Sequence, residues 1–450
     1  MMRRVALAML LAVAGLLLFL FFSKEKIMLG AQAYVYGYPL VIMDITRAQS
    51  AIDIGPENQL RRVRKFPDAT FKEVVRPNVD TLYTTAFLSM KKGPWVFEMP
   101  EQFERYELMP FMDAWTNVFA SPGTRTRQKN EFVFLLAGPD WQGQVPSHMT
   151  LLRSPTDMVW LIGRTQTNGV GDFETVHRIQ NGLRLYPLNG KARLDTEPEK
   201  SIHFSKRSLP PTAQMKALST ESFFDRMMQL MADNPPSPQD EPLLKQLQQF
   251  GLQAGHPVQL AWVDAACFAL GRWLADQKIK QVLNSKEADG QWRTPPLNLG
   301  QYGTDYNTRA VVAMVGLGAN LPEDALYPNT ALDHQGKALN GQHAYQIHFD
   351  AKQLPPVKAF WSITAYGADE FLIDNPIQRY ALGDRDPLQY NADGSLDIWI
   401  QAAPPQQLER RSNWLPVKDK ASFLLNARLY WPKEEALKMQ WQMPPVVRLN

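Results

Sequence analysis

The segment Thr81-Leu-Tyr-Thr-Thr-Ala-Phe-Leu-Ser-Met90, followed by Lys91-Lys-Gly-Pro94 and Trp95-Val-Phe-Glu-Met99, decides the fold class. Two stretches rich in β-branched and aromatic residues flank a turn of lysine, glycine and proline, which is the pattern of two strands with a tight connection. Comparable stretches follow at 131–137 and 158–164. Strands this short and this regularly interrupted predict a β-sandwich or barrel over about 71–205.

The periodicity changes to a helical one on both sides of this region. Residues 27–50 read as a helix, and after about residue 211 apolar side chains recur at helical spacing. They are Phe223, Phe224, Met227, Met228 and Met231. The segment Asn234-Pro-Pro-Ser-Pro238 interrupts the pattern, and 242–250 and 258–283 continue it. We therefore expect a helical connecting unit at 206–290.

Strand patterns return after residue 291. Asn340-Gly341 precedes an alternating stretch at 343–349, and Asp393-Gly394 precedes another at 396–401. Both dipeptides are typical of hairpin turns, and 360–366 and 423–431 alternate as well. The sequence thus predicts an α+β chain that is mainly β, with a helix and β-sandwich domain at 27–205, the helical unit, and a second β-sandwich domain at 291–450.

A membrane segment is predicted at the N-terminus. Residues 5–22 are an uncharged apolar run between Arg3-Arg4 and Ser23-Lys-Glu-Lys26. As a helix the run is roughly 27 Å long, close to the hydrocarbon thickness of a bilayer. The positive charge before the run places the following body in the periplasm, attached to the inner membrane through residues 5–22. The alternative is that 1–26 is a signal peptide and the protein is secreted after cleavage.

Composition excludes several classes of protein. The 450 residues include 48 basic and 45 acidic side chains, a net charge of +3, so we expect no nucleic-acid partner. One cysteine, Cys267, rules out a disulfide framework and cysteine-based metal sites. On a strand, His343 and His348 face opposite sides and cannot share an ion. No phosphate-binding or dinucleotide motif is present in its proper context, and we expect neither a cofactor nor a metal.

The most concentrated group of polar residues is Val75-Arg-Pro-Asn-Val-Asp-Thr-Leu-Tyr83, which begins a strand. Arg76 and Asn78 are candidates for ligand binding, because a guanidinium fork and a short amide can orient a polar ligand. Asp80 and Tyr83 are candidates for catalysis. The structural alternative is that Asn78 and Asp80 cap a turn while Arg76 pairs with Asp80.

Two further groups combine polar and aromatic side chains. In Asp113-Ala-Trp-Thr-Asn117 we expect the odd-numbered residues to share one strand face, with Asp113 as a catalytic candidate and Trp115 and Asn117 as ligand-binding ones. The other group, Tyr302-Gly-Thr-Asp-Tyr-Asn-Thr-Arg309, offers Tyr302, Asp305 and Arg309 for ligand binding. Alternatively, Asp305 and Arg309 form an ion pair on a helix.

These segments resemble two bacterial families of unknown function. The segments 34–40, 76–83, 113–123 and 138–141 resemble domain-of-unknown-function family 1254. The segments 302–309, 324–328, 360–364, 393–395, 413–416 and 428–432 resemble its usual C-terminal partner, family 1214. The resemblance implies an N-terminal immunoglobulin-like β-sandwich, a helical connection and a C-terminal jelly-roll-like β-sandwich in a protein of the cell envelope. It implies no established reaction.

Two hypotheses of function follow from the residues. In the first, the anchored periplasmic protein binds a small polar, sugar-like or aromatic ligand on or between its β-sandwiches, either alone or as a homo-oligomer. In the second, it is a metal-independent hydrolase or lyase in which Asp80 or Asp113 transfers a proton and Arg76 and Tyr83 stabilise developing charge. The sequence leaves both open.

Overall fold

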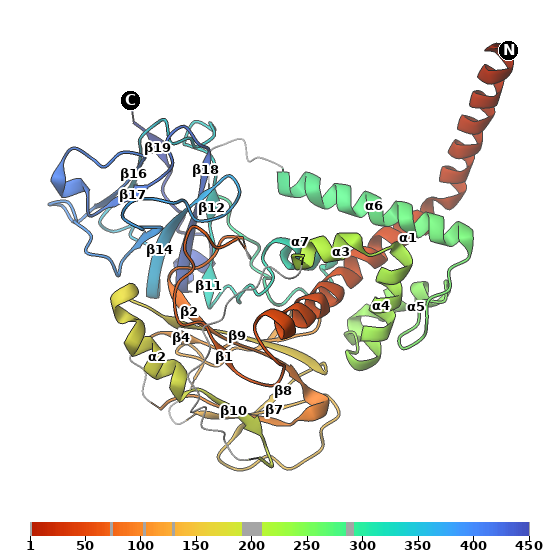
Figure 1. Cartoon of the computed structure of the whole chain (residues 1–450), viewed down its shortest axis with the longest axis horizontal. Helices are drawn as coiled ribbons and strands as arrows, with labels where there is room; N and C mark the ends of the chain where they lie inside the picture. The colour runs from red at the N-terminus through yellow and green to blue at the C-terminus, as the bar shows by residue number, and fades with distance from the viewer. Residues whose placement is uncertain are drawn as a thin grey trace.

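The protein is an α+β protein, mainly β, in which four sheets and a layer of helices pack together (Figure 1). The computed structural model describes residues 2–72, 75–101, 105–127, 131–190, 209–284 and 292–449, and the side chains of 2–19 and 283–284 are outside that description. The predicted fold class is confirmed. The predicted domain limits at 205/206 and 290/291 fall outside the described residues.

Two sheets form the N-terminal β region. The first has the order β1-β2-β9-β5-β6, with β4 also paired to β9, and the second has the order β10-β3-β7-β8. Their strands are β1 Arg61–Arg62, β2 Thr81–Ser89, β3 Trp95–Glu98, β4 Glu107–Leu108, β5 Phe111–Asp113, β6 Val118–Ala120, β7 Val133–Ala137, β8 Thr150–Arg153, β9 Met158–Gln166 and β10 Arg184–Pro187. Apolar side chains of both sheets, among them Phe97, Phe111 and Leu161, share one core. The strands predicted around 81–99 therefore form as expected.

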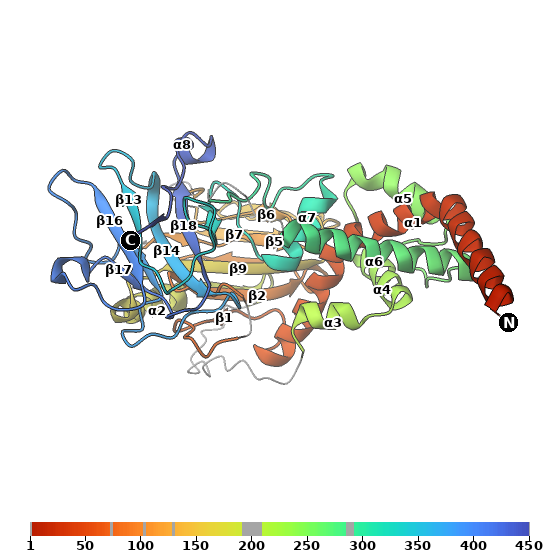
Figure 2. The ribbon, with the colours of Figure 1, turned by 90° about the horizontal axis from the view of Figure 1, so that it is seen from above.

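The helices form a layer at one end of the molecule (Figures 1 and 2). Six of them are α1 Met2–Asp53, α3 Pro211–Ala217, α4 Thr220–Asp233, α5 Glu241–Gln248, α6 Trp262–Asn284 and α7 Tyr306–Val315. Two glycines let α1 and α6 approach closely. A Cβ added at Gly30 would lie 2.7 Å from Phe268 Cα, and one at Gly271 would lie 2.3 Å from the carbonyl oxygen of Ile27. Larger residues at this crossing would push the helices apart.

The segment predicted to cross the membrane belongs to the first turns of α1. The side chains of 5–19 are outside the described part, so this prediction falls largely on residues that are not described. Among the residues that are described, no helix combines the length and the apolar character needed to span a bilayer.

Two more sheets form the C-terminal β region. One has the order β11-β18-β14-β15, with β12 also on β18, and the other has the order β17-β16-β13-β19. The strands are β11 Ala325–Leu326, β12 Asn329–Thr330, β13 Tyr345–Phe349, β14 Val357–Gly367, β15 Ala381–Gly383, β16 Leu396–Gln401, β17 Trp414–Pro416, β18 Phe423–Pro432 and β19 Val447–Arg448. A single apolar core joins the two sheets, as Ile347, Ile363 and Ile398 illustrate.

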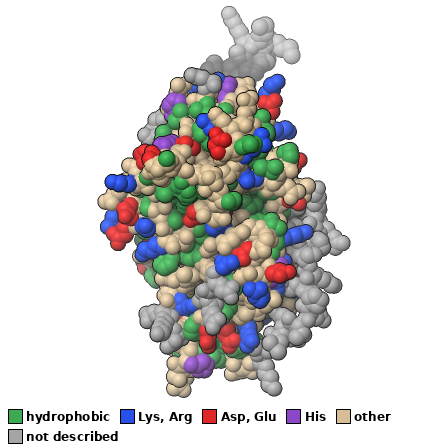
Figure 3. All heavy atoms as spheres, turned by 90° about the vertical axis from the view of Figure 1, so that its left-hand side faces the viewer, with side chains coloured by type: hydrophobic (Ala, Val, Ile, Leu, Met, Phe, Trp, Pro, Cys, Tyr) green, Lys and Arg blue, Asp and Glu red, His purple; other side chains and the backbone are tan. Residues whose placement is uncertain are grey.

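The strands predicted at 343–349, 360–366, 396–401 and 423–431 are confirmed with small shifts at their ends. The immunoglobulin-like and jelly-roll-like forms of the two β regions stay predictions. Short helices α2 Phe173–Gly182 and α8 Glu434–Leu437 lie outside the helical layer. On the face that Figure 3 shows, acidic and basic side chains are interspersed with apolar ones, in keeping with the near-balanced charge of the chain.

Candidate functional site

The first group of candidate residues lies where the N-terminal and C-terminal β regions touch. Asp80, which is 1% exposed, precedes β2, and its carboxylate is bound by residues from elsewhere in the chain. Ser362 Oγ on β14 donates a 2.7 Å hydrogen bond to Asp80 Oδ2, and the Arg385 guanidinium pairs with Oδ1. Arg385 Nη1 also donates to the backbone oxygen of Asp80 at 3.1 Å. The Asp80 carboxylate therefore joins two sheets of different β regions.

Asn78 caps the turn before β2, as the structural alternative predicted. Its Oδ1 accepts hydrogen bonds from the backbone nitrogens of Asp80 and Thr81, at 2.6 and 3.2 Å. Its Nδ2 donates to the Tyr430 hydroxyl on β18 at 2.7 Å. Such turns depend on a short side chain that can reach its own backbone. We call Asn78, Asp80 and their partners Ser362, Arg385 and Tyr430 the Asp80 junction.

The predicted ion pair between Arg76 and Asp80 is wrong. Arg76 Nη2 lies 2.8 Å from Glu370 Oε1 instead, and the backbone oxygen of Arg76 accepts a hydrogen bond from Arg428. Arg76 has a positive φ of 50°, which is uncommon for a residue other than glycine. Tyr83 lies under the guanidinium of Arg164, 5.0 Å from its carbon to the ring centre. The residues of the first group thus have different partners along the contact between the two β regions and do not form one site.

The second group forms a turn, so the prediction that 113–117 is a strand is wrong. Asp113 ends β5, and its Oδ1 accepts from the backbone nitrogens of Trp115 and Asn117, at 2.9 and 2.8 Å. Asn117 Nδ2 donates to Oδ2 at 3.1 Å. Thr116 adopts a left-handed φ of 69°. The aspartate competes for backbone hydrogen bonds and bends the chain there, as short acidic side chains do.

The third group begins α7, where Asp305 is the N-cap. Its Oδ1 accepts from the backbone nitrogen of Thr308 at 3.1 Å, and its Oδ2 accepts from Asn298 at 3.1 Å. Asp305 therefore caps the helix in place of the ion pair with Arg309 that was the alternative. The side chain of Arg309, one turn further on, lies in the interior and is only 2% exposed.

Aromatic rings surround the guanidinium of Arg309. Its guanidinium carbon lies 5.6 Å from the ring centres of Tyr36 and Trp115 and 5.2 Å from that of Tyr306. Rings at these distances attract a cation through their negative faces. Nε and Nη2 of Arg309 are buried and have no hydrogen-bond partner. Rings cannot replace those hydrogen bonds, so two strong donors remain unused.

A second buried carboxylate accepts hydrogen bonds from the hydroxyls of two of these rings. Asp240, 1% exposed, accepts from the Tyr36 hydroxyl at 3.1 Å and from the Tyr306 hydroxyl at 2.8 Å. Tyr36 belongs to α1, and its ring centre is 4.9 Å from that of Trp115. We call Tyr36, Asp113, Trp115, Asp240, Tyr302, Tyr306 and Arg309 the Arg309 cluster. It lies where the N-terminal β region meets the helical layer.

Burial changes the acid–base properties of this cluster. Burial raises the pKa of Asp113 from 3.8 to about 6, although hydrogen bonds from Asn117 and the charge of Arg309 oppose the rise. Burial also raises the pKa of Tyr302 to about 12, and the neighbouring Asp113 adds to it. The pKa of Tyr306 rises to about 12 because of burial and its hydrogen bond to Asp240. Asp113 can therefore exchange a proton near neutral pH while the tyrosines stay neutral donors.

The structure brings the second and third groups together and keeps the first group apart from them. Asp113, Trp115, Tyr302 and Arg309 share the Arg309 cluster, whereas Asn78 and Asp80 belong to the Asp80 junction. Sequence reasoning missed Tyr36, Asp240 and Tyr306. Tyr36 and Tyr306 do lie in segments that carry the family resemblance, but Asp240 follows a proline-rich break with no signal of its own.

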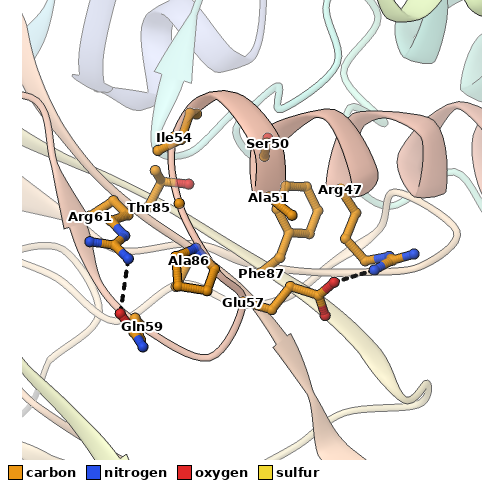
Figure 4. Close-up of a pocket in the computed structure, with 12 residues that line it drawn as sticks. Arg47, Ser50, Ala51, Ile54, Glu57, Gln59, Arg61, Thr85, Ala86 and Phe87 are labelled. Atoms are coloured by element: carbon orange, nitrogen blue, oxygen red, sulfur yellow. Dashed lines mark hydrogen bonds and ion pairs between the residues drawn. The ribbon is translucent and has the colours of Figure 1, made fainter. Parts of the chain in front are cut away.

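Other parts of the described structure offer weaker candidates for a metal or ligand site. No group of three or more metal-ligating side chains occurs among the described residues. A cavity between the end of α1 and β2 holds about 20 Å³, room for roughly one water molecule (Figure 4). Its lining includes an ion pair between Arg47 and Glu57 and a 2.9 Å hydrogen bond from Arg61 to Gln59.

Two family models match the chain, both of families described as proteins of unknown function. DUF1254 matches residues 57–187 and DUF1214 matches residues 324–434. The chain therefore carries a DUF1254 region followed by a DUF1214 region, in the order that the resemblance predicted. No curated protein matches the chain.

Two solved structures match the chain at low sequence identity. A crystal structure of a protein from Vibrio parahaemolyticus matches 94% of this chain and 100% of its own, with a TM-score of 0.70 and 22% identity. An uncharacterized protein from Burkholderia cenocepacia matches 97% of this chain and 96% of its own, with a TM-score of 0.46 and 13% identity. The first likeness shows a common fold and no common activity.

Proposed function

We propose that this chain, with its DUF1254 and DUF1214 regions, binds a small carboxylate ligand at the Arg309 cluster. The observation that carries the proposal is the pair of buried donors, Nε and Nη2 of Arg309, that have no acceptor. A buried donor without a partner costs about 1–3 kcal/mol, and more when the group is charged. An acceptor supplied by a ligand would recover that free energy.

The arrangement favours a carboxylate over other anions. Nε and Nη2 project in parallel from one edge of the planar guanidinium, so they match the two oxygens of a carboxylate. The ring centres of Tyr36 and Trp115 both lie 5.6 Å from the guanidinium carbon. Sites of this kind hold a flat or sugar-like body on apolar walls and orient it with a few polar groups. The ligand class is therefore a carboxylate with an aromatic or sugar-like body.

Among the described residues, the other fully buried arginines do not share this deficit, and the partly exposed Arg61, Arg76 and Arg385 each leave only Nε without a partner. Arg164 donates to Asn320 Oδ1 at 2.6 Å and to the backbone oxygen of Gly318 at 2.8 Å. Arg428 donates to Thr364 Oγ1 at 2.8 Å and to the Tyr366 hydroxyl at 2.7 Å. The fold thus supplies acceptors to the guanidinium groups of Arg164 and Arg428. The absence of acceptors at both Nε and Nη2 distinguishes Arg309 from them.

Thermal unfolding of the whole chain with benzoate, gluconate or inorganic phosphate tests the proposal. A carboxylate at a hundred times its Kd should raise the free energy of unfolding by about 2.7 kcal/mol. Arg309→Lys keeps the charge and removes the fork, so it should abolish the effect. Arg164→Lys is the matched control and should retain it. If both variants respond as the unsubstituted chain does, the site is elsewhere; if phosphate stabilises as strongly as benzoate, the assignment to carboxylates is wrong.

A second candidate function is catalysis on the bound ligand, and the buried Asp113 favours it. With a pKa of about 6, this carboxyl can act as a general acid or base at neutral pH. A ligand that the screen identifies should then be converted by the chain and bound without conversion by Asp113→Asn. Equal turnover in that variant would remove Asp113 from the mechanism. The pairing of Asp80 with Arg385 and Ser362 supports a structural role for that residue instead.

We also propose that residues 5–22 anchor the protein in the inner membrane with its body in the periplasm. The apolar run and the arginines before it support this location. An anchored chain should stay with membranes after alkaline carbonate extraction, and protease added to spheroplasts should digest its body. Release by carbonate, at a length shortened by about the first 26 residues, would favour a cleaved signal peptide.

A further inference from the structure

Several large apolar side chains are exposed where α1 leaves the body of the molecule. Phe21 and Phe22 are 75% and 78% exposed, and Trp262, at the start of α6, is 82% exposed. The N-terminal turns of α1 project beyond the body at this end (Figures 1 and 2). Exposed aromatic residues gathered at one end of a protein mark a contact with something apolar.

Contacts between α1 and α6 show that these side chains lie at one level. Lys26 Nζ is 2.7 Å from Asp264 Oδ1, the site of Gly30 touches Phe268, and the Tyr34 hydroxyl donates to Asp276 at 3.0 Å. The contacting residues are 238 apart in the chain at the first two contacts and 242 apart at the third, so the two helices run in the same direction where they cross. By this register Trp262 lies beside 22–24, which is immediately after the apolar run 5–22.

We propose that Trp262, together with Phe21 and Phe22, rests in the headgroup region of the bilayer and fixes the body upright on the membrane. This inference rests on the proposed anchor, because the apolar run continues into α1 directly before Phe21. Tryptophan favours the membrane–water boundary, where its ring is buried and its N–H stays hydrated. Exposed Lys24, in the same turn of α1, can reach lipid phosphates.

A second tryptophan on the same helix gives a measure of depth. Trp273 is 57% exposed and follows Trp262 by eleven residues, about 16 Å further along α6. If only the start of α6 touches the bilayer, Trp273 stays in water. If α6 lay flat on the membrane, both side chains would meet lipid. The two positions thus distinguish an upright body from a recumbent one.

Nitroxide quenching of a fluorophore at single positions tests the inference on the full chain in vesicles. The twelve tryptophans preclude intrinsic fluorescence, so Cys267→Ala would serve as the background for labels at Trp262→Cys, Trp273→Cys and Leu408→Cys. Leu408 is 71% exposed and belongs to the C-terminal β region, which makes it the matched control. Headgroup nitroxides should quench the label at 262 several-fold more than those at 273 and 408.

The other possible outcomes would contradict the inference, the upright arrangement or the anchor separately. Chains that float with the vesicles but show equal, weak quenching at all three positions would overturn the inference and leave the anchor standing. Equal, strong quenching at 262 and 273 would overturn the upright arrangement. Disulfide-linked dimers of the Trp262→Cys chain, with no quenching, would show that a second copy covers this surface. Chains that do not float would overturn the proposed anchor itself.

Discussion

The Asp80 junction and the Arg309 cluster both bury charged and aromatic side chains, but they differ in how their donors are used. In the junction, Asp80 meets Arg385 and Ser362, and Asn78 meets Tyr430. In the cluster, Arg309 faces rings and leaves two nitrogens without acceptors. Both oxygens of the Asp80 carboxylate thus have partners and hold two β regions together, although Nε of Arg385 has no hydrogen-bond partner, whereas the guanidinium of Arg309 leaves two adjacent donors unpaired.

The difference shows why buried charge alone does not locate a functional site. Each group has a deeply buried charged residue at its centre, Asp80 at 1% and Arg309 at 2% exposed, and both contain an aspartate that the sequence nominates for catalysis. What separates them is the number of unsatisfied guanidinium donors, which is two at Arg309 and one, Nε of Arg385, in the junction. A satisfied pair is stabilising only while both members stay. Four experiments can break or sharpen this comparison.

Asp80→Ala should produce the largest loss of stability. The substitution leaves Arg385, whose side chain is 14% exposed, without its carboxylate. Breaking a buried pair in this way costs about 3–5 kcal/mol. Urea unfolding monitored by circular dichroism measures the change. The double variant with Arg385→Ala should lose clearly less than the sum of the single losses; strict additivity would mean that the two side chains do not stabilise one another.

Asp113 should make the stability of the folded chain depend on pH. Between about pH 4 and pH 6 the unfolded chain ionises this group while the folded chain keeps its proton, because its pKa rises from 3.8 to about 6. The free energy of unfolding therefore falls as pH rises through this interval, by about 2–3 kcal/mol from this group. In Asp113→Asn that part of the fall should vanish, as urea unfolding from pH 3.5 to 8 would show.

Glu107 supplies a control for the pH experiment. Burial raises the pKa of this carboxyl from 4.5 to about 8. Its contribution to the free energy of unfolding therefore falls as pH rises over a wider interval, which extends to pH 8. Glu107→Gln should flatten the profile above pH 6, and Asp113→Asn should not. A profile that Asp113→Asn leaves unchanged would contradict the deep burial of Asp113.

Arg309→Met should leave the stability of the ligand-free chain unchanged or raise it, by up to about 2 kcal/mol. The reason is that methionine removes two unpaired donors, although it also removes the attraction of three rings. Arg428→Met should instead destabilise the folded chain, because it removes the hydrogen bonds that Arg428 donates to Thr364 and Tyr366. Urea unfolding of both variants gives the comparison, and an equal loss in both would show that Arg309 has partners as good as those of Arg428.

Asp369→Ala should have the smallest effect. Asp369 pairs with Lys72 at 3.1 Å where the two β regions also meet, but the two side chains are 61% and 45% exposed. Exposed pairs contribute about 0–1 kcal/mol. A loss as large as that of Asp80→Ala, in the same urea experiment, would mean that position at the domain contact matters more than burial.

Much of the fold was predictable from local pattern. Alternation between 81 and 99 and the dipeptide Asp393-Gly394 act through neighbouring residues, and the corresponding strands form where expected. The turn at 113–117 was not predicted, because alternation of apolar and polar residues describes a strand and a hairpin turn equally well. There the hydrogen bonds of Asp113 to its own backbone decide the outcome.

The candidate site was predictable only in pieces. Asp113, Trp115, Tyr302 and Arg309 all carried a signal in the sequence, but no pattern indicates that 113 and 309 share a cluster. Asp240 has no local signal, since its role depends on hydroxyls of Tyr36 and Tyr306 that arrive from two distant helices. The absence of acceptors around Arg309 is likewise a property of packing in three dimensions.

The central claim is most directly tested by a crystal structure of the chain with benzoate. We predict a carboxylate whose two oxygens lie about 2.7–2.9 Å from Nε and Nη2 of Arg309, with the benzoate ring against Tyr36 or Trp115. Benzoate bound elsewhere, or water molecules that occupy both donors in the presence of saturating benzoate, would contradict the claim.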